Sequence, residues 1–310
     1  MTEPVEETKE RIAKRMARAG LCSRRDAEKW ILDGRVKLNG QVLTTPAVTV
    51  SDEDDILVDG NPLPQKERAR LWRYHKPAGL VTSHKDEKGR DTVFSKLPDD
   101  MPRVISVGRL DLNSEGLLLL TNDGELARRL ELPATGWKRK YRVRVHGHPK
   151  ERELSRLADG VTIEGVKYGS VEAVLDSTKG ANSWLTISIR EGKNREVRKI
   201  MEHLGYPVLR LIRVSYGPLQ LGELASGEVD EVRAKVLREQ MGVKKMEVST
   251  EEPKAPASRK PRMQGKLNLK GKTVESRKGK SVKVVTRGKA KPTGEGKGRP
   301  APKGRKPRRP

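Results

Sequence analysis

The sequence predicts an α+β protein with two folded units and a disordered basic tail. Segments with the alternation typical of strands outnumber the helical segments and do not alternate with them regularly. This pattern favours a mixed, largely antiparallel sheet over a doubly wound one. An Asn-Gly pair between two short apolar runs indicates a hairpin near the N-terminus. All ten aromatic residues precede residue 217, so the end of the chain lacks the side chains that build a core.

The first unit is expected over residues 9–60 and opens with two short helices. Basic side chains recur three and four residues apart over residues 11–18, so they share one stripe of a helix. Gly20 is a natural end for that helix. Ser23 is a natural N-cap for a second helix over residues 24–33, whose apolar side chains would face a core.

A β-hairpin and one further strand complete this unit. Asn39-Gly40 stands between short apolar runs at residues 36–38 and 42–43, which is typical of a tight hairpin. Another apolar run, at residues 56–58, is expected to add a strand. The first unit is therefore predicted to be a pair of helices beside a hairpin.

A linker over residues 61–69 leads to the second unit, which is expected over residues 70–241. Its candidate strands cover residues 71–75, 104–109, 117–121, 140–146, 161–163, 171–175, 185–190 and 208–214. Its candidate helices cover residues 124–130, 150–157, 195–204 and 229–241. This mixture of elements places the α+β sheet in the second unit.

The rest of the chain, residues 242–310, is expected to be disordered. From residue 244 onward it carries 23 basic and 5 acidic residues, with 8 Pro and 8 Gly. Such a segment cannot bury enough apolar surface to offset the entropy lost on ordering. The whole chain has a net charge of +24, which predicts a polyanionic partner, most simply a nucleic acid.

Several other classes of protein are excluded. The longest apolar run, residues 117–120, is too short to span a membrane, and the acidic N-terminus does not resemble a signal peptide. One cysteine, Cys22, cannot form an internal disulfide or a cysteine zinc cluster. The run at residues 271–273 lacks the upstream glycine of a phosphate-binding loop. We therefore expect a cytoplasmic protein with no cofactor, metal or membrane partner.

One polar loop is a candidate for chemistry. The run GRLDLNSEG, residues 108–116, follows a candidate strand and precedes the apolar run at residues 117–120. The first strand would deliver Arg109 and Asp111 into this loop. A carboxylate at the end of a rigid strand can act as a nucleophile or a base. Loop aspartates more often serve turns and caps, so this spacing alone does not decide the role of Asp111.

The first unit resembles the S4 RNA-binding domain. The run RMARAGLCSRRDAEKWILDGRVKLNGQVL, residues 15–43, matches that domain along its whole length. The resemblance implies binding to structured rRNA through one face of the first helix and the turn before the second. Phosphate contacts of this kind supply affinity without reading sequence. The residues implied in binding are Arg11, Lys14, Arg15, Arg18, Arg24 and Arg25.

The whole order of motifs resembles the RsuA-type branch of the pseudouridine synthases. The S4-like unit is followed by GRLD, KRKYRVRV, EGKNREVRKIMEHLG and VLRLIRVSYG. The resemblance implies a monomeric, cofactor-free isomerase that converts a uridine of rRNA to pseudouridine. The tail and the motif composition are most similar to members that act on large-subunit 23S rRNA. Another large-subunit site, a small-subunit 16S site and a non-catalytic S4-type ribosome-binding factor remain the alternatives.

The same resemblance implies roles for five residues. Asp111 is the nucleophile, with attack at C6 of the base or at C1′ of the ribose left open. Tyr141 lies against the target base and is a candidate proton acceptor, and Arg198 pairs with Asp111. Leu211 packs on the base. Arg109 fills the gap left in the RNA or holds a phosphate.

The residues alone allow plainer interpretations of three of these positions. Alternation groups Tyr141 with core positions of its strand, and Leu211 is by itself a core residue. Asn194 is the expected N-cap of the helix over residues 195–204. This cap places Arg198 in the second turn, from which its side chain could reach a strand-end carboxylate or contact solvent or phosphate instead.

Overall fold

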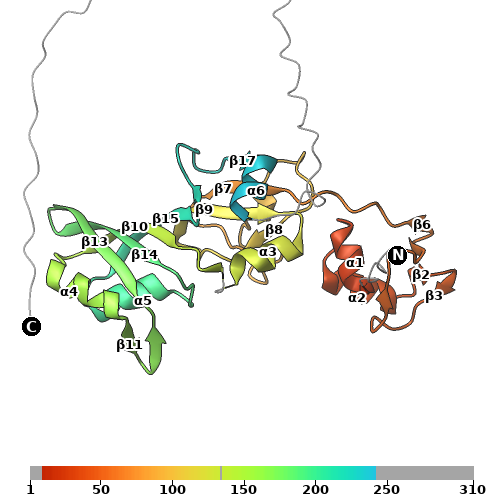
Figure 1. Cartoon of the computed structure of the whole chain (residues 1–310), viewed down its shortest axis with the longest axis horizontal. Coiled ribbons are helices and arrows are strands. Elements are labelled where there is room, and N and C mark those ends of the chain that lie inside the picture. The colour runs from red at the N-terminus through yellow and green to blue at the C-terminus, as the bar shows by residue number, and fades with distance from the viewer. Residues whose placement is uncertain (1–8, 133–134, 242–310) are drawn as a thin grey trace, which may run out of the picture. The chain divides into compact units, whose positions relative to one another are not determined.

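The computed structural model describes residues 9–132 and 135–241 (Figure 1). The predicted disordered tail, residues 242–310, lies outside the described residues. An N-terminal unit with its own core precedes a unit built on one large sheet. Within the described ranges, no helix is both long and apolar enough to cross a membrane.

The N-terminal unit contains the predicted helix pair and hairpin. Ser23 begins the second helix, because its Oγ accepts a hydrogen bond from the backbone N–H of Asp26 at 3.0 Å. Asn39 and Gly40 both have positive φ, as the two-residue hairpin turn requires. The elements are β1 (Glu10–Arg11), α1 (Ile12–Arg18), α2 (Arg24–Leu32), β2 (Val36–Leu38), β3 (Gln41–Val42), β4 (Thr49–Val50), β5 (Ile56–Val58) and β6 (Asn61–Pro62).

The second unit is built on a nine-stranded sheet with the order β13-β14-β10-β15-β9-β7-β17, with β16 on β15 and β8 on β9. The pair β15–β9 is parallel and the other pairs are antiparallel, so the predicted mixed, largely antiparallel α+β sheet is confirmed. Its strands are β7 (Leu71–Lys76), β8 (Ile105–Val107), β9 (Ser114–Thr121), β10 (Arg139–His146), β13 (Val171–Lys179), β14 (Asn182–Ile189), β15 (Val208–Tyr216), β16 (Leu219–Gln220) and β17 (Val229–Glu231).

Helices cover both faces of this sheet. One core joins β10, β13 and β14 to α4 (Glu151–Ser155) and α5 (Glu196–His203). Another joins β7 and β9 to α3 (Gly124–Glu131) and α6 (Ala234–Met241) (Figure 1). Leucines at 118 and 120 enter the first core and those at 117 and 119 the second, so β9 is buried on both faces. The smaller elements are η1 (Phe94–Lys96), η3 (Arg156–Asp159), β11 (Val161–Ile163) and β12 (Val166–Tyr168).

The helix predicted over residues 229–241 is wrong in its first part. Residues Val229–Glu231 form β17, and Val229 pairs with Tyr74 of β7. The helix α6 starts only at Ala234. Without β17, the backbone polar groups along this edge of β7 would lack their strand partners, so tertiary pairing overrides the local helical pattern.

Candidate active site

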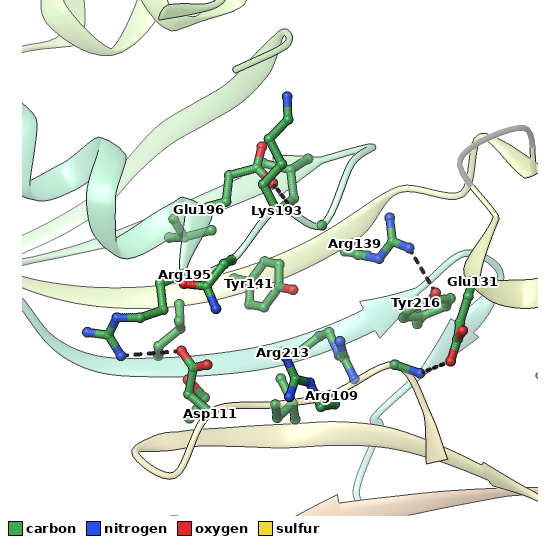
Figure 2. Close-up of a pocket in the computed structure, with 18 of the residues that line it drawn as sticks. Arg109, Asp111, Glu131, Arg139, Tyr141, Lys193, Arg195, Glu196, Arg213 and Tyr216 are labelled. Carbon is green, nitrogen blue, oxygen red and sulfur yellow. Dashed lines mark hydrogen bonds and ion pairs between the residues drawn. The ribbon is translucent and has the colours of Figure 1, made fainter. Parts of the chain in front are cut away.

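A cavity of about 530 Å³ opens where the loop before β9 meets β10, β15 and the segment before α5 (Figure 2). Four residues predicted for the site line it together: Arg109, Asp111, Tyr141 and Leu211. They come from three separate segments of the sequence, which the central strands of the sheet bring side by side. Arg198, the fifth residue predicted here, is not among the lining side chains.

Asp111 stands at the rim of this cavity. It lies between β8 and β9, and its backbone carbonyl accepts the N–H of Ser114 at 3.0 Å, which closes a tight turn. Its carboxylate is 34% exposed and lies 3.5 Å from Nη1 of Arg195 (Figure 2). The carboxylate is therefore held by a rigid turn and one cation, and stays open to a molecule that enters the cavity.

Lys76, at the end of β7, supports the Asp111 loop from below. Its side chain is fully buried, and Nζ donates to the carbonyl oxygens of Pro77 at 3.0 Å, Asp111 at 3.1 Å and Ser114 at 2.9 Å. Burial lowers the pKa of Lys76 to about 8. Sequence reasoning missed this residue because lysine is rarely buried completely.

Gly116 lets β15 approach this loop closely. It pairs with Arg213 in the parallel β9–β15 ladder and has a φ of +99°. A Cβ atom at this position would lie 2.3 Å from the carbonyl oxygen of Arg213. Only glycine fits here, and the close approach places the β15 side chains beside the Asp111 loop.

Tyr141 and Leu211 form the wall and floor of the cavity. The side chains of β10 alternate between buried and exposed, which puts Tyr141 on the buried face with Val143 and Val145, as predicted. Val143 pairs with Leu211 of β15. Tyr141 is 7% exposed and Leu211 is 5% exposed, yet both line the cavity. One core face therefore opens onto the site.

The cation in ion-pair contact with Asp111 is Arg195, whereas Arg198, the predicted partner, acts on this carboxylate only at longer range. Helix α5 begins at Glu196, with Arg195 in a left-handed conformation at φ +52° as its N-cap, in place of Asn194. This backbone turn directs Arg195 toward the carboxylate. Arg198 instead donates from Nη2 to the carbonyl of Asn113 at 2.9 Å, which supports the same loop.

Glu196 fixes the segment that carries Arg195. It is 3% exposed, and its carboxylate accepts the backbone N–H of Lys193 at 2.9 Å. Burial, together with the neighbouring carboxylate of Glu191, raises the pKa of Glu196 to about 7. Glu191 in turn accepts the N–H of Gly169 at 2.6 Å. These contacts tie the start of α5 to the turn at Gly169.

We predict that Glu196→Gln removes a pH-dependent loss of stability. Because folding raises this pKa from 4.5 to about 7, the wild type takes up a proton on folding between these values. The stability that this proton uptake contributes is complete below pH 4.5, the pKa of Glu196 in the unfolded chain. It is lost as the pH rises through about 7, the pKa in the folded protein. When the pH rises from 5 to 8, the unfolding free energy of the variant should increase by about 2–3 kcal/mol relative to that of the wild type.

Urea unfolding of both proteins at pH 5 and pH 8 measures this difference. Glutamine keeps an oxygen for the N–H of Lys193 and can donate to Glu191, so the variant should fold. A stability difference that does not change with pH would show that Glu196 does not take up the proton.

The remaining predicted binding residues lie in the N-terminal unit, where Glu10 divides them into two groups. Glu10 forms ion pairs with Lys14 at 3.3 Å, Arg15 at 3.7 Å and Arg18 at 2.8 Å. The side chains of Arg11, Arg24 and Arg25 are exposed. Much of the stripe on α1 is therefore neutralised from within, and the arginines at the start of α2 remain open to an anion.

The cavity combines one carboxylate with cations, an aromatic wall and an apolar floor. Among the described residues, no three His, Cys, Asp or Glu side chains gather where they could share a metal ion. The group in the cavity that is best placed for nucleophilic or base chemistry is Asp111. Such a site suits a planar apolar ring that carries polar edges.

Comparison with known families gives two matches. A family described as RNA pseudouridylate synthase matches residues 70–203, and the S4 domain matches residues 10–56. A solved structure described as a pseudouridylate synthase is similar with a TM-score of 0.54 at 26% identity, covering 74% of this chain and 98% of that one. The fold and the two-part organisation thus have known counterparts.

Individual relatives extend this similarity across both units. An uncharacterized RNA pseudouridine synthase of Rickettsia bellii is 48% identical over 74% of this chain and 99% of its own length. Two proteins named ribosomal large subunit pseudouridine synthase B are also similar. The one from Pseudomonas aeruginosa is 42% identical over 76% of this chain and 63% of its own length. The one from Haemophilus influenzae is 39% identical over 82% of this chain and 73% of its own length.

Proposed function

Because the chain belongs to the RNA pseudouridine synthases and carries an S4 domain, we propose that it isomerises one uridine of large-subunit 23S rRNA. The observation that carries the proposal is the position of Asp111, partly exposed in a cavity with Tyr141, Leu211 and an arginine partner. The names of the Pseudomonas and Haemophilus relatives support the large subunit as the address.

The reaction rearranges bonds within one nucleotide. The N1–C1′ bond breaks, the uracil turns while still held, and a C5–C1′ bond forms. The proton that leaves C5 is balanced by one gained at N1, so no oxidant, reductant or energy source is consumed. Asp111 is the proposed nucleophile, and attack at either C6 or C1′ requires its carboxylate to face the entering nucleotide.

The other residues of the cavity hold the detached base. Tyr141 is proposed as the aromatic wall and as the acceptor of the C5 proton, and Leu211 as the floor on which the ring packs. Arg195 orients the carboxylate of Asp111 across their 3.5 Å ion pair. Confinement of this kind keeps the uracil close to C1′ until the carbon–carbon bond forms.

The target uridine must leave its stack to reach this cavity. Extrusion of a base costs a few kcal/mol, which contacts to the flipped base and to the backbone offset. Arg109 is proposed to fill the gap left in the RNA or to hold a phosphate nearby. The S4 domain is proposed to anchor structured rRNA through its exposed arginines.

The proposed function is tested by tritium release from rRNA labelled at C5 of its uridines. The wild type should release tritium from 23S rRNA and not from 16S rRNA. Release from 16S rRNA alone would contradict large-subunit rRNA as the substrate, but it would still support the proposed isomerisation. No release from either RNA, with binding intact, would favour a non-catalytic S4-type binding factor.

We predict that the paired substitution Arg24→Gln and Arg25→Gln weakens RNA binding more than Arg18→Gln does. Arg18 already has a carboxylate partner in Glu10, at 2.8 Å, whereas Arg24 and Arg25 are exposed. Each lost phosphate contact should reduce the slope of log affinity against log salt by about 1. Filter-binding titrations of 23S rRNA at several salt concentrations measure this, and equal slopes for all proteins would contradict it.

A further inference from the structure

The cavity extends well beyond the residues assigned to the uracil. In Figure 2, Asp111 and Arg195 lie at one end, Arg139 and Tyr216 at the other, and Arg109 and Arg213 between them. The volume of about 530 Å³ falls in the range of sites for whole small molecules, roughly 300–1000 Å³. Such a cavity has room for more of a nucleotide than its pyrimidine ring.

Arg213 is a buried cation with an unused donor. The residue is 3% exposed, and its Nε donates to the carbonyl of Leu117 at 2.7 Å. Its Nη2 atom is buried and has no hydrogen-bond partner. Arg213 also lines the cavity, so a ligand there can approach its guanidinium group. A buried donor without a partner is costly in a folded protein.

Arg139 lies beside it and is equally constrained. It is 9% exposed and donates from Nη1 to the carbonyl of Arg190 at 2.7 Å and from Nη2 to the hydroxyl of Tyr216 at 2.9 Å. The guanidinium carbons of Arg139 and Arg213 lie 4.7 Å and 5.2 Å from the centre of the Tyr216 ring. The ring of Tyr216 thus contacts two cations, Arg139 at this end of the cavity and Arg213 nearer its middle.

Carboxylates do not neutralise these cations. Within the described ranges, neither Arg139 nor Arg213 forms an ion pair with an acidic side chain, whereas Arg195 pairs with Asp111 in the same cavity. Glu131 lies at the edge of this end, where its Oε1 accepts the N–H of Gly108 at 2.6 Å. Buried charges normally have a counter-charge, so an anionic ligand in the cavity would supply the one that these arginines lack.

The spacing along β15 indicates where that anion belongs. Leu211 and Arg213 are two residues apart on one strand and both line the cavity. Side chains two residues apart on a strand are separated by about 6.6 Å and share a face. The floor proposed for the uracil is therefore one step from the arginines, which is the reach from a base to a neighbouring phosphate.

We propose that Arg213 and Arg139 bind a backbone phosphate next to the target uridine. The planar guanidinium fork matches phosphate oxygens and can donate two parallel hydrogen bonds. This contact would hold the ribose on one side while the detached uracil turns above Leu211. The inference rests on the proposed function, because it takes the substrate to be an RNA strand with one nucleotide in the cavity.

The test is a scan of neutral linkages in a short rRNA fragment that the wild type converts. Single methylphosphonates replace, one at a time, the phosphates within two nucleotides of the target uridine. The steady-state kcat/KM is measured for wild type, Arg213→Gln, Arg213→Lys and a control, Arg73→Gln. Arg73 is an arginine of the same sheet that pairs with Asp230 and does not line the cavity.

We expect one neutral linkage to slow the wild type and Arg73→Gln by about 10-fold to 100-fold. Arg213→Gln should show that loss already on unmodified RNA and no further loss at this linkage. Arg213→Lys, which keeps the charge but not the fork, should fall between them. Equal penalties in wild type and Arg213→Gln at every linkage would overturn the proposal. A second set of RNAs lacks one base beside the target uridine and keeps every phosphate. If Arg213→Gln is insensitive to one of these losses while the wild type is slowed by it, Arg213 contacts that base and the proposal is overturned.

A titration without RNA turnover separates this inference from the proposed function. Uridine 3′,5′-bisphosphate should bind the wild type at least about 10-fold more tightly than uridine, and Arg213→Gln should lose that difference. Inorganic phosphate that binds as tightly as the bisphosphate would indicate a free-phosphate site and overturn the proposed source. If no rRNA is converted, the proposed function fails, and this titration still decides whether the arginines bind phosphate.

Discussion

Replacement of Asp111 by asparagine is expected to abolish pseudouridine formation and leave the fold intact. The amide keeps the size and most hydrogen bonds of the carboxylate but is a poor nucleophile. Loss of a catalytic nucleophile in other enzymes costs on the order of 10⁴-fold or more in kcat, and we expect an effect of that size. Single-turnover conversion of 23S rRNA at saturating enzyme measures it.

The stability of this variant provides the control. The Asp111 carboxylate is 34% exposed and its arginine partner 49% exposed, and exposed ion pairs contribute at most about 1 kcal/mol. Urea unfolding and rRNA affinity should therefore stay close to wild type. A variant that folds, binds and still converts rRNA at more than a tenth of the wild-type rate would remove Asp111 from the proposed chemistry.

Gly116→Ala is expected to destabilise the second unit severely. The new Cβ would lie 2.3 Å from the carbonyl oxygen of Arg213, and the φ of +99° is one that alanine rarely adopts. Separation of β9 from β15 would relieve the clash only by breaking the ladder that aligns the Asp111 loop with Leu211. Overpacking and backbone strain together should cost roughly 3–5 kcal/mol.

Gly205→Ala is the matched control for that substitution. Gly205 also has a positive φ, +84°, but a Cβ there would meet nothing within 4 Å. Only the conformational cost remains, about 1–2 kcal/mol. Urea midpoints of the two variants separate crowding from backbone preference. Similar losses for both would show that the close approach of the two strands is not what requires glycine at 116.

The sheet was largely predictable because its strands carry their own pattern. In β10, alternation alone places Tyr141 on the buried face, and the structure confirms it. The apolar run at residues 117–120 predicted an apolar strand, and β9 is buried on both faces. The edge strand β17 was missed because its three residues pair with β7 without a pattern of their own.

The site was less predictable because it depends on backbone geometry. The motif resemblance brought Asp111, Tyr141 and Leu211 to one cavity, where the structure also places them. A helix pattern does not reveal that Arg195 adopts a left-handed conformation. Because of this conformation, Arg195 makes the ion pair with Asp111 that was expected of Arg198. The burial of Lys76 depends on carbonyl groups that only the folded loop brings together.

The central claim is that this chain makes one pseudouridine in large-subunit rRNA and needs Asp111 to do so. The most direct measurement is a pseudouridine map of total rRNA from cells that lack the protein, complemented with wild type or with Asp111→Ala. The account predicts that one 23S uridine loses its modification and that only wild type restores it. Restoration by Asp111→Ala, or a map without any lost site, would contradict the account.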